Sequence, residues 1–345
     1  MKRILLVKTS SMGDIFHTLP ALTDAKRQCP DVIFDWVVEK SFAEISGWHH
    51  AVDEVIPIQF RKWRKNLLKS VFDSECRDFL KQLRQRQYDL IIDAQGLLKS
   101  ALVARLAKGS RYGYDKCSIR EPWATKFYQH HYAVDKQQHA VERIRQLFAQ
   151  IFDYQTPTTT ADYGIRHHFD SMTHSKQADY IVFLHGTTWQ TKLWPEQYWV
   201  ELGKHANQAG LQVKLTSGNA EEKARADRIA AQLDNAEALV RLPIAEVGQL
   251  LSQAKGSVAV DTGFGHLCAA LALPCVSLYG PTNPELTCTH GANQLHLASD
   301  FDCAPCLKRH CHLPNKSDYT VQPPCFGVMT PDRVWQAIKT LVRDA

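Results

Sequence analysis

A polar, glycine-bearing turn directly after the first apolar run constrains this chain more than any other feature. The apolar run Ile4 to Val7 is typical of a buried strand, and residues 8–20 lead from it through Gly13 and Asp14 into a helical pattern. In an α/β protein such a turn lies at the carboxyl end of a strand, where ligands bind. Because the turn carries an acid, an imidazole, an ammonium group and hydroxyls, it predicts a functional site.

A second turn of the same kind follows the strand-like run Ser257 to Val260. It reads Asp261-Thr262-Gly263-Phe264-Gly265-His266 and also enters a helical pattern. The chain has 345 residues, which exceeds what one hydrophobic core usually holds. Two such turns in a chain of this length predict an α/β fold of two Rossmann-like domains with a cleft between them.

Strand-like and helix-like segments alternate throughout, as α/β architecture requires. We expect a first domain over 1–160, a linker over 161–178 and a second domain over 179–330. The expected strands are 4–7, 32–38, 54–56, 89–94, 180–184, 211–216, 238–242, 257–260 and 275–279. The expected helices are 16–28, 67–86, 97–107, 138–151, 196–209, 220–233, 244–253 and 264–271.

Charge is distributed unevenly along the chain. Residues 1–160 hold 25 Lys and Arg against 18 Asp and Glu, a net charge of +7, while the remainder has a net charge of −2. The densest basic patch is Arg61-Lys62-Trp63-Arg64-Lys65 with Lys69, which is either a solvated surface or a site for phosphates or carboxylates. No apolar run approaches the roughly 20 residues that cross a bilayer, so we expect a cytoplasmic protein.

Asp14 has two interpretations. An acid at a helix start can be an N-cap that stabilises the helix by about 1 kcal/mol and does no chemistry. A carboxylate at a cleft can also act as a general base toward an attacking hydroxyl. His17, one turn further along the helix, either orients that carboxylate or is an inert packed residue.

The second half of the chain has the features of a nucleotide site. Glycines and backbone amides that open a helix attract phosphate, as in the turn at Asp261. The loop that follows Tyr180 to Leu184 adds hydroxyls and an ammonium group, and Glu221 or Glu222 after the next strand can bind ribose or simply favour a helix start. Because neither dinucleotide nor P-loop motifs are present, hydride transfer and ATP hydrolysis are disfavoured.

Together these residues resemble the lipopolysaccharide heptosyltransferases of glycosyltransferase family 9, and within them the heptosyltransferase I type. The resemblance covers almost the whole chain. It is carried by residues 8–14, 34–39, 93–97, 120–122, 136–143, 261–263 with His266, and 279–282. It implies the GT-B fold, with the last helix, within 331–345, packing back on the first domain. It also implies inverting transfer of L-glycero-D-manno-heptose from ADP-heptose to the Kdo residue of Kdo-lipid A.

The resemblance also implies a role for each matching position. Asp14 is the expected catalytic base, beside a turn shaped by Ser10, Ser11 and Gly13. The anionic acceptor is expected to pair with Arg61, Arg64, Arg120, Lys136 and His139. The expected donor contacts are Thr187, Thr188 and Lys192 to the diphosphate, Glu222 to the ribose, Asp261 to the heptose, and Thr262, Gly263 and His266 to the phosphates. We expect no cofactor, metal or nucleic acid, and a monomer at the cytoplasmic face of the inner membrane.

The chain departs from the heptosyltransferase I pattern in a cysteine-rich segment. A structural zinc can be held by Cys303, Cys306, Cys311 and Cys325, but the presence of only one Cys-x-x-Cys motif argues against it. Disulfides are disfavoured in the cytoplasm, so free thiols are the favoured state of these cysteines. The segment is reminiscent of heptosyltransferase II, which is one alternative. A GT-B nucleotide-sugar epimerase and a non-catalytic nucleotide-binding or nucleic-acid-binding protein are the others.

Overall fold

The chain forms two compact α/β units, Met1–Ile165 and Arg166–Ala345. The computed structural model describes residues 1–63, 73–170, 179–313 and 319–344. The boundary between the units falls inside the expected linker, 161–178. Part of that linker is helical, because Arg166–Asp170 forms the short helix α8. Phe169 of α8 is buried, and α8 packs against α11 (Ile244–Gln253).

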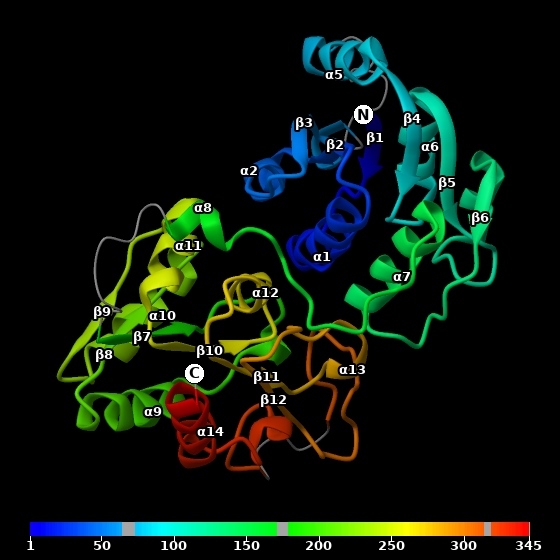
Figure 1. Cartoon of the computed structure of the whole chain (residues 1–345). Coiled ribbons are helices and arrows are strands. Elements are labelled where there is room, and N and C mark those ends of the chain that lie inside the picture. Colours follow the sequence, from blue (N-terminus) through cyan, green and yellow to red (C-terminus); the bar gives the residue numbers. More distant parts are fainter. Residues whose placement is uncertain (64–72, 171–178, 314–318, 345) are drawn as a thin grey trace. The chain divides into compact units, whose positions relative to one another are not determined.

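The first unit contains a parallel six-stranded sheet of order β3-β2-β1-β4-β5-β6 (Figure 1). The strand order reverses between β1 and β4, and at such a switch point the loops after the two strands diverge and leave room for a ligand. The strands are β1 Lys2–Val7, β2 Val32–Glu39, β3 Val52–Ile58, β4 Gln87–Asp93, β5 Lys108–Tyr114 and β6 His130–Tyr132.

Helices cover both faces of this sheet. Phe148 of α7 stacks on Phe34 of β2 with ring centroids 6.0 Å apart, and α7 packs against α1. Val37 of β2 has the opposite parity and lies in the core formed with α5 and α6. The helical segments are α1 Met12–Gln28, η1 Lys40–Phe42, α2 Ala43–Gly47, α3 Phe60–Trp63, α5 Ser74–Gln85, α6 Leu98–Leu106, η2 Pro122–Phe127 and α7 Ala140–Phe152.

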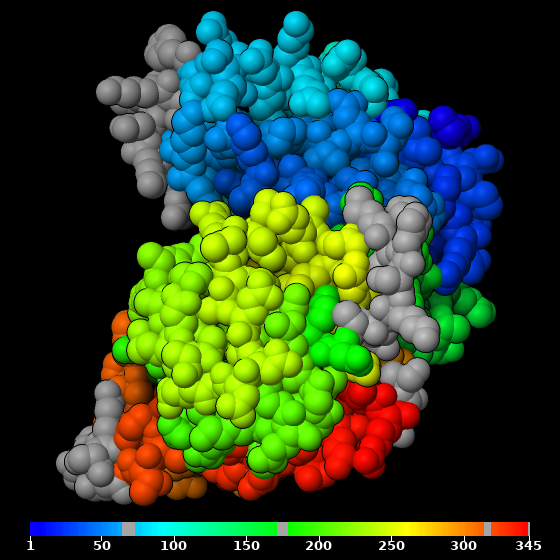
Figure 2. Space-filling model, turned by 90° about the vertical axis from the view of Figure 1, so that its left-hand side faces the viewer, coloured from blue at the N-terminus to red at the C-terminus, as the bar shows by residue number. Residues whose placement is uncertain are grey.

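The second unit repeats this architecture with the sheet order β12-β11-β10-β7-β8-β9. Its switch point lies between β10 and β7. The strands are β7 Tyr180–Leu184, β8 Gln212–Leu215, β9 Ala236–Ala238, β10 Gly256–Val260, β11 Cys275–Tyr279 and β12 Gln294–Ala298. On the face shown in Figure 2, the chain coloured green to yellow, which includes α9, α10 and α11, forms the middle of this unit's surface, with orange and red parts of the chain at its lower border.

The last helix, α14, contributes to the core of the second unit. Val334 and Ile338 are buried there, and α14 packs on α9 and on β10 to β12. That this helix also packs back on the first domain stays a prediction. The helical segments are η3 Gln190–Lys192, α9 Glu196–Gln208, α10 Ala220–Ala230, α12 Gly263–Ala270, α13 Pro284–Thr287, η5 Pro324–Phe326 and α14 Pro331–Asp344.

Three strands were absent from the sequence-based expectation. Lys108–Tyr114 has polar residues and two glycines where a buried strand usually has apolar ones, His130–Tyr132 is very short, and Gln294–Ala298 is an edge strand. The strand expected at 238–242 is Ala236–Ala238. Among the described helices, none is both long enough and apolar enough to cross a membrane.

One buried ion pair joins α1 to α7. Arg145 Nε donates to Asp24 Oδ2 at 2.6 Å, and both side chains are almost fully buried. The same guanidinium also contacts Glu142 at 3.1 Å and donates to the carbonyl of Thr159 at 3.0 Å. Burial opposes the charge of Arg145, but its acidic partners prevail and raise its pKa. The pair therefore stabilises the first unit only while both partners are present.

We predict that Arg145→Ala lowers the free energy of unfolding by about 3–5 kcal/mol, because it leaves the Asp24 carboxylate buried without its partner. The matched control is Arg27→Ala, which removes the exposed ion pair with Asp162 and should cost at most about 1 kcal/mol. Denaturant unfolding of both variants measures the difference. Equal losses would contradict the role of burial.

Candidate active site

The loops after β1 and β4 hold each other at the switch point of the first unit. Lys8 is buried, and its Nζ donates to the carbonyl of Ala94 at 3.2 Å. The backbone N–H groups of Thr9 and Ser10 both donate to Gln95 Oε1, at 3.0 and 3.2 Å. The turn singled out in the sequence is therefore fixed to the neighbouring strand end by the side chains of Lys8 and Gln95.

Asp14 is oriented by the residues around it and is still accessible. Its Oδ2 accepts hydrogen bonds from the backbone N–H of Ser11 at 2.5 Å and from Ser11 Oγ at 3.1 Å. Its Oδ1 lies 3.6 Å from Lys8 Nζ, and 38% of its side chain is exposed. The N-cap of α1 is Ser11 and not Asp14, but Asp14 does stabilise the helix start, as the structural interpretation expected. Asp14 is the third helical residue, and its carboxylate reaches back to the cap.

The sequence analysis did not single out Asp93 as a functional residue, although this fully buried acid ends β4. Its Oδ1 accepts from the backbone N–H groups of Gln95 and Gly96 at 2.9 and 3.1 Å. Its Oδ2 accepts from Ser100 Oγ at 2.8 Å and from the hydroxyl of Tyr128 at 2.6 Å. Burial raises its pKa, although these four donors oppose the shift. The signal available in the sequence was an acid at the end of an apolar strand, two residues before a Gln-Gly pair.

One of the expected acceptor residues, His139, lies near the turn that holds Asp14. The rings of His139 and His17 are 5.5 Å apart, which places His139 beside α1 one turn from Asp14. Arg120 and Lys136 are exposed, and no contact that we find among the described residues joins either side chain to Asp14. Gly13 and Ser10 are partly buried in the turn.

The basic patch at residues 61–65 differs from its sequence-based interpretation. Arg61 and Lys62 are exposed, and Lys62 Nζ lies 3.3 Å from Asp73 Oδ2. Trp63 is not part of a binding surface, because its side chain is buried. The centre of its ring lies 5.6 Å from the centre of the Phe79 ring. Arg64, Lys65 and Lys69 lie outside the described residues.

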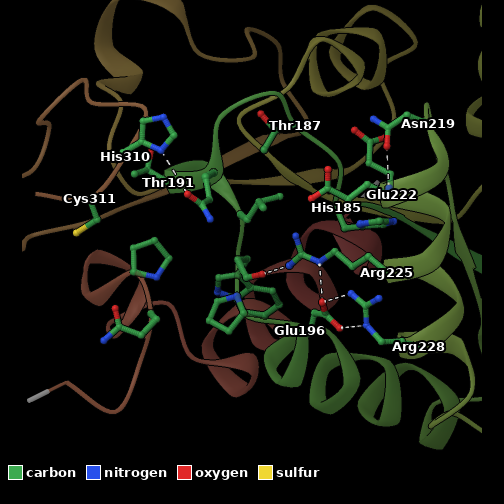
Figure 3. Close-up of a pocket in the computed structure, with 17 residues that line it drawn as sticks. His185, Thr187, Thr191, Glu196, Asn219, Glu222, Arg225, Arg228, His310 and Cys311 are labelled. Carbon is green, nitrogen blue, oxygen red and sulfur yellow. Dashed lines mark hydrogen bonds and ion pairs between the residues drawn. The ribbon is translucent and has the colours of Figure 1, made fainter. Parts of the chain in front are cut away.

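The second unit has a cavity of about 540 Å³ at the carboxyl ends of β7 and β8 (Figure 3). Polar groups from the segments that follow β7 and β8 line this cavity, and such a lining suits a small polar ligand. Its lining includes His185, Thr187, Gln190, Glu196, Asn219, Glu222, Arg225 and His310. Thr188, by contrast, is exposed and does not line this cavity.

Glu222, which lines this cavity, lies close against Gly186. Glu222 Oε2 accepts from the backbone N–H of Gly218 at 2.7 Å, while the helix start is capped by Asn219, whose Oδ1 accepts from the N–H of Glu222 at 2.9 Å. A Cβ at position 186 would lie 2.6 Å from Cδ of Glu222. Glycine is therefore required at 186 if the carboxylate is to keep this position.

Lys192 and Asp261 come together from the loops that follow β7 and β10. Lys192 Nζ lies 2.7 Å from Asp261 Oδ2, which also accepts from Thr282 Oγ1 at 2.8 Å. Asp261 directly precedes Thr262, the N-cap of α12, and Gly263 begins that helix. His266 is buried in the same helix. The arrangement places a cation and an acid at the start of a helix, where anions bind readily.

His185 and Arg225 are buried side chains that line the cavity. Arg225 donates to the carbonyl of Trp194, and its Nε lies 3.9 Å from Glu196 Oε1. Burial, with the positive charge of Arg225 as the second cause, lowers the pKa of His185 to about 4. His185 is therefore neutral in the folded protein near pH 7.

This shift predicts a pH-dependent stability. Between pH 7.5 and 5 the unfolded chain protonates His185, whereas the folded chain does not, so the free energy of unfolding should fall by about 2 kcal/mol from this residue. His185→Gln should remove that part of the decrease, whereas the exposed His312→Gln should retain it. Denaturant midpoints across this pH range test the prediction, and an unchanged slope in His185→Gln would contradict it.

The four cysteines of the cysteine-rich segment surround a second cavity. Cys303, Cys306, Cys311 and Cys325 line a space of about 430 Å³. All four are free thiols, and Cys325 is buried. Within residues 1–63, 73–170, 179–313 and 319–344, no three His, Cys, Asp or Glu side chains are grouped closely enough to hold a metal ion.

Known proteins that are similar to this chain identify its family. A family model described as glycosyltransferase family 9 (heptosyltransferase) matches residues 76–317. The chain belongs to glycosyltransferase family 9. It is 50% identical to lipopolysaccharide heptosyltransferase 1 of Pseudomonas aeruginosa, over 99% of this chain and 98% of that one. It is 48% identical to the enzyme of that name from Salmonella typhimurium, over 86% of this chain and 94% of the relative.

Solved structures agree with the family assignment. The E. coli heptosyltransferase WaaC with ADP-2-deoxy-2-fluoro heptose has a TM-score of 0.86 and 41% identity, and covers 98% of this chain and 99% of that one. E. coli heptosyltransferase II, at 23% identity, covers 100% of this chain and 99% of that one with a TM-score of 0.74, and shows the fold alone. The predicted GT-B fold and a family 9 glycosyltransferase of heptosyltransferase type are confirmed.

Proposed function

We propose that this family 9 glycosyltransferase transfers L-glycero-D-manno-heptose from ADP-heptose to the Kdo residue of Kdo-lipid A, with inversion of the anomeric centre. The observation that carries the proposal is 50% identity to a lipopolysaccharide heptosyltransferase 1 along almost the whole chain. The two switch points support it, because one presents an oriented, accessible carboxylate and the other presents groups suited to a nucleotide sugar.

The second unit binds the donor in this proposal. Glu222 accepts hydrogen bonds from the ribose hydroxyls, since its carboxylate faces the cavity beside Gly186. Thr187, Thr188 and Lys192 hold the diphosphate, and Asp261 binds the heptose hydroxyls. Thr262, Gly263 and His266 contact phosphate at the start of α12. Lys192 then stabilises the negative charge that develops as ADP leaves, and such electrostatic stabilisation is usually the largest single contribution to catalysis.

The first unit binds the acceptor, and Asp14 acts as the base. The hydrogen bond from the N–H of Ser11 fixes one carboxylate oxygen, which leaves the other to take the proton of the attacking Kdo hydroxyl. The anionic groups of the acceptor pair with Arg61, Arg64, Arg120, Lys136 and His139. The net charge of +7 over residues 1–160 favours this partner.

The proposal needs neither a cofactor nor a metal ion, because Lys192 and the amides at the start of α12 supply the positive charge that the leaving ADP requires. It describes a monomer that works at the cytoplasmic face of the inner membrane, where its acceptor lies. ADP release from ADP-heptose, measured with Kdo-lipid A, with heptosylated Kdo-lipid A and without acceptor, tests it. Release only with Kdo-lipid A is expected. Release only with the heptosylated acceptor would indicate a heptosyltransferase II, and sugar conversion without acceptor would indicate an epimerase.

Asp14→Asn should reduce kcat by about 10²–10⁴-fold, the usual contribution of a general base. The asparagine oxygen still accepts from the N–H of Ser11, so the helix start and ADP affinity should be unchanged. Asp31→Asn, an exposed acid elsewhere in the first unit, is the matched control and should retain full activity. Activity of Asp14→Asn near that of the control would refute the base assignment.

Lys192→Ala should weaken ADP binding by about tenfold or more, because a charge-assisted contact to phosphate is lost. Lys223→Ala is a suitable control, since Lys223 pairs with Asp227 on the surface of α10. Calorimetric titration with ADP measures both. If ADP binds equally well to both variants, Lys192 does not hold the diphosphate.

A further inference from the structure

The helix α6 (Leu98–Leu106) has apolar residues on both of its faces. Ser100, Ala101, Val103 and Ala104 are buried toward the sheet. On the outward face, Leu98, Leu102 and Leu106 recur at every fourth position and are 39%, 49% and 45% exposed. A helix that covers a sheet normally has a polar outer face, so this row of leucines indicates a surface that binds an apolar partner.

The segment η2 (Pro122–Phe127) extends the same surface. It packs against α6, which lies beside β4 and β5 in Figure 1. Its Trp123 is 65% exposed, and the ammonium group of Lys126 lies 4.1 Å from the centre of the indole ring. Nine large apolar side chains are exposed in the part of the chain that the structure describes, and four of them lie on α6 and η2. They are therefore concentrated on one surface.

The charge around this surface is strongly positive. Residues 97–108 and 119–129 contain five basic side chains, Lys99, Arg105, Lys108, Arg120 and Lys126. The one acid in these two segments is Glu121, whose carboxylate is engaged because it accepts from the backbone N–H of Leu98 at 2.7 Å. The surface is therefore apolar with a cationic border, which suits an anionic partner. A second copy of the chain would bring like charges together.

This surface adjoins the candidate acceptor site. The backbone N–H of Glu121 donates to the carbonyl of Gly96 at 3.2 Å. Gly96 belongs to the β4 turn, in which Gln95 holds the Thr9 and Ser10 amides next to Asp14. A partner bound to α6 and η2 therefore lies against the same loop that shapes the site around Asp14.

We propose that α6 and η2 form a docking face for the surface of an anionic lipid bilayer. Leu98, Leu102 and Leu106 enter the boundary between headgroups and acyl chains, and Trp123 occupies the interface, where tryptophan is enriched. Lys99, Arg105 and Lys126 meet lipid phosphates. This proposal rests on the proposed function in one respect, which is that the acceptor is a lipid embedded in a bilayer. It adds the surface by which the protein reaches that bilayer.

Binding of the purified full-length protein to vesicles tests the docking face without any substrate. Wild type should co-sediment with vesicles that contain phosphatidylglycerol and much less with pure phosphatidylcholine. The double variant Leu102→Glu with Leu106→Glu should lose at least about tenfold in binding, because carboxylates are repelled by the anionic interface and the apolar contact is lost. Trp123→Ser should lose binding as well. All three side chains are exposed, so the fold should be retained.

The matched control is Leu286→Glu on α13 of the second unit, a leucine that is 40% exposed. It should bind vesicles like wild type. If the double variant also binds like wild type, the docking face is refuted. The proposal is equally refuted if the wild-type protein is a dimer that the double variant dissociates while vesicle binding is unchanged, since α6 would then be a contact between two copies.

An activity comparison separates this proposal from the proposed function. With a water-soluble, deacylated Kdo acceptor the double variant should match wild type, whereas with Kdo-lipid A in vesicles its KM should rise at least about tenfold. Equal losses on both acceptors would overturn the docking role. If wild type transfers no heptose to either acceptor, the proposed function fails, and the vesicle-binding result still decides the docking face.

Discussion

The buried carboxylate of Asp93 fixes the geometry on which the first unit's site depends. Its four hydrogen bonds hold the turn after β4, and two of them come from the backbone of that turn. The turn places Gln95, whose side chain accepts from the amides of the neighbouring loop. That loop ends at Ser11, the cap that orients Asp14. A buried acid that touches no expected substrate group thus positions the expected catalytic one.

In the second unit the loops at the candidate site are also held in place by contacts between strand ends, but these contacts are of other kinds. Gly186 and Glu222 bring the ends of β7 and β8 together by close approach, while Lys192 and Asp261 join the ends of β7 and β10 through an ion pair. In the first unit the site lies where the strand order of the parallel sheet reverses, and in the second unit Lys192 and Asp261 meet at the corresponding place while the cavity lies next to it, at the ends of β7 and β8. The fold determines where the groups meet, and the loop residues determine what they can bind.

Much of this was predictable from the sequence, for physical reasons. The buried strand β7 and the buried part of β1 are continuous apolar runs, and β10 and β11 are each interrupted by one serine, so the glycine-bearing turns after β1 and β10 were easy to locate. Long-range contacts were not predictable. Nothing local indicates that Trp63 packs on Phe79, that Lys192 meets Asp261, or that the apolar face of α14 belongs to the core of the second unit. The outward leucines of α6 follow the usual helical period, so only their exposure distinguishes them from core residues.

The central claim is that Asp14 takes the proton of the acceptor hydroxyl while the second unit holds the nucleotide sugar. A crystal structure with an unreactive ADP-heptose analogue and a Kdo acceptor tests it most directly. The account predicts a carboxylate oxygen of Asp14 about 2.6–3.2 Å from the attacking Kdo hydroxyl, with that hydroxyl opposite the leaving diphosphate. A hydroxyl that instead contacts another basic side chain, with Asp14 bonded only to Ser11, would contradict it.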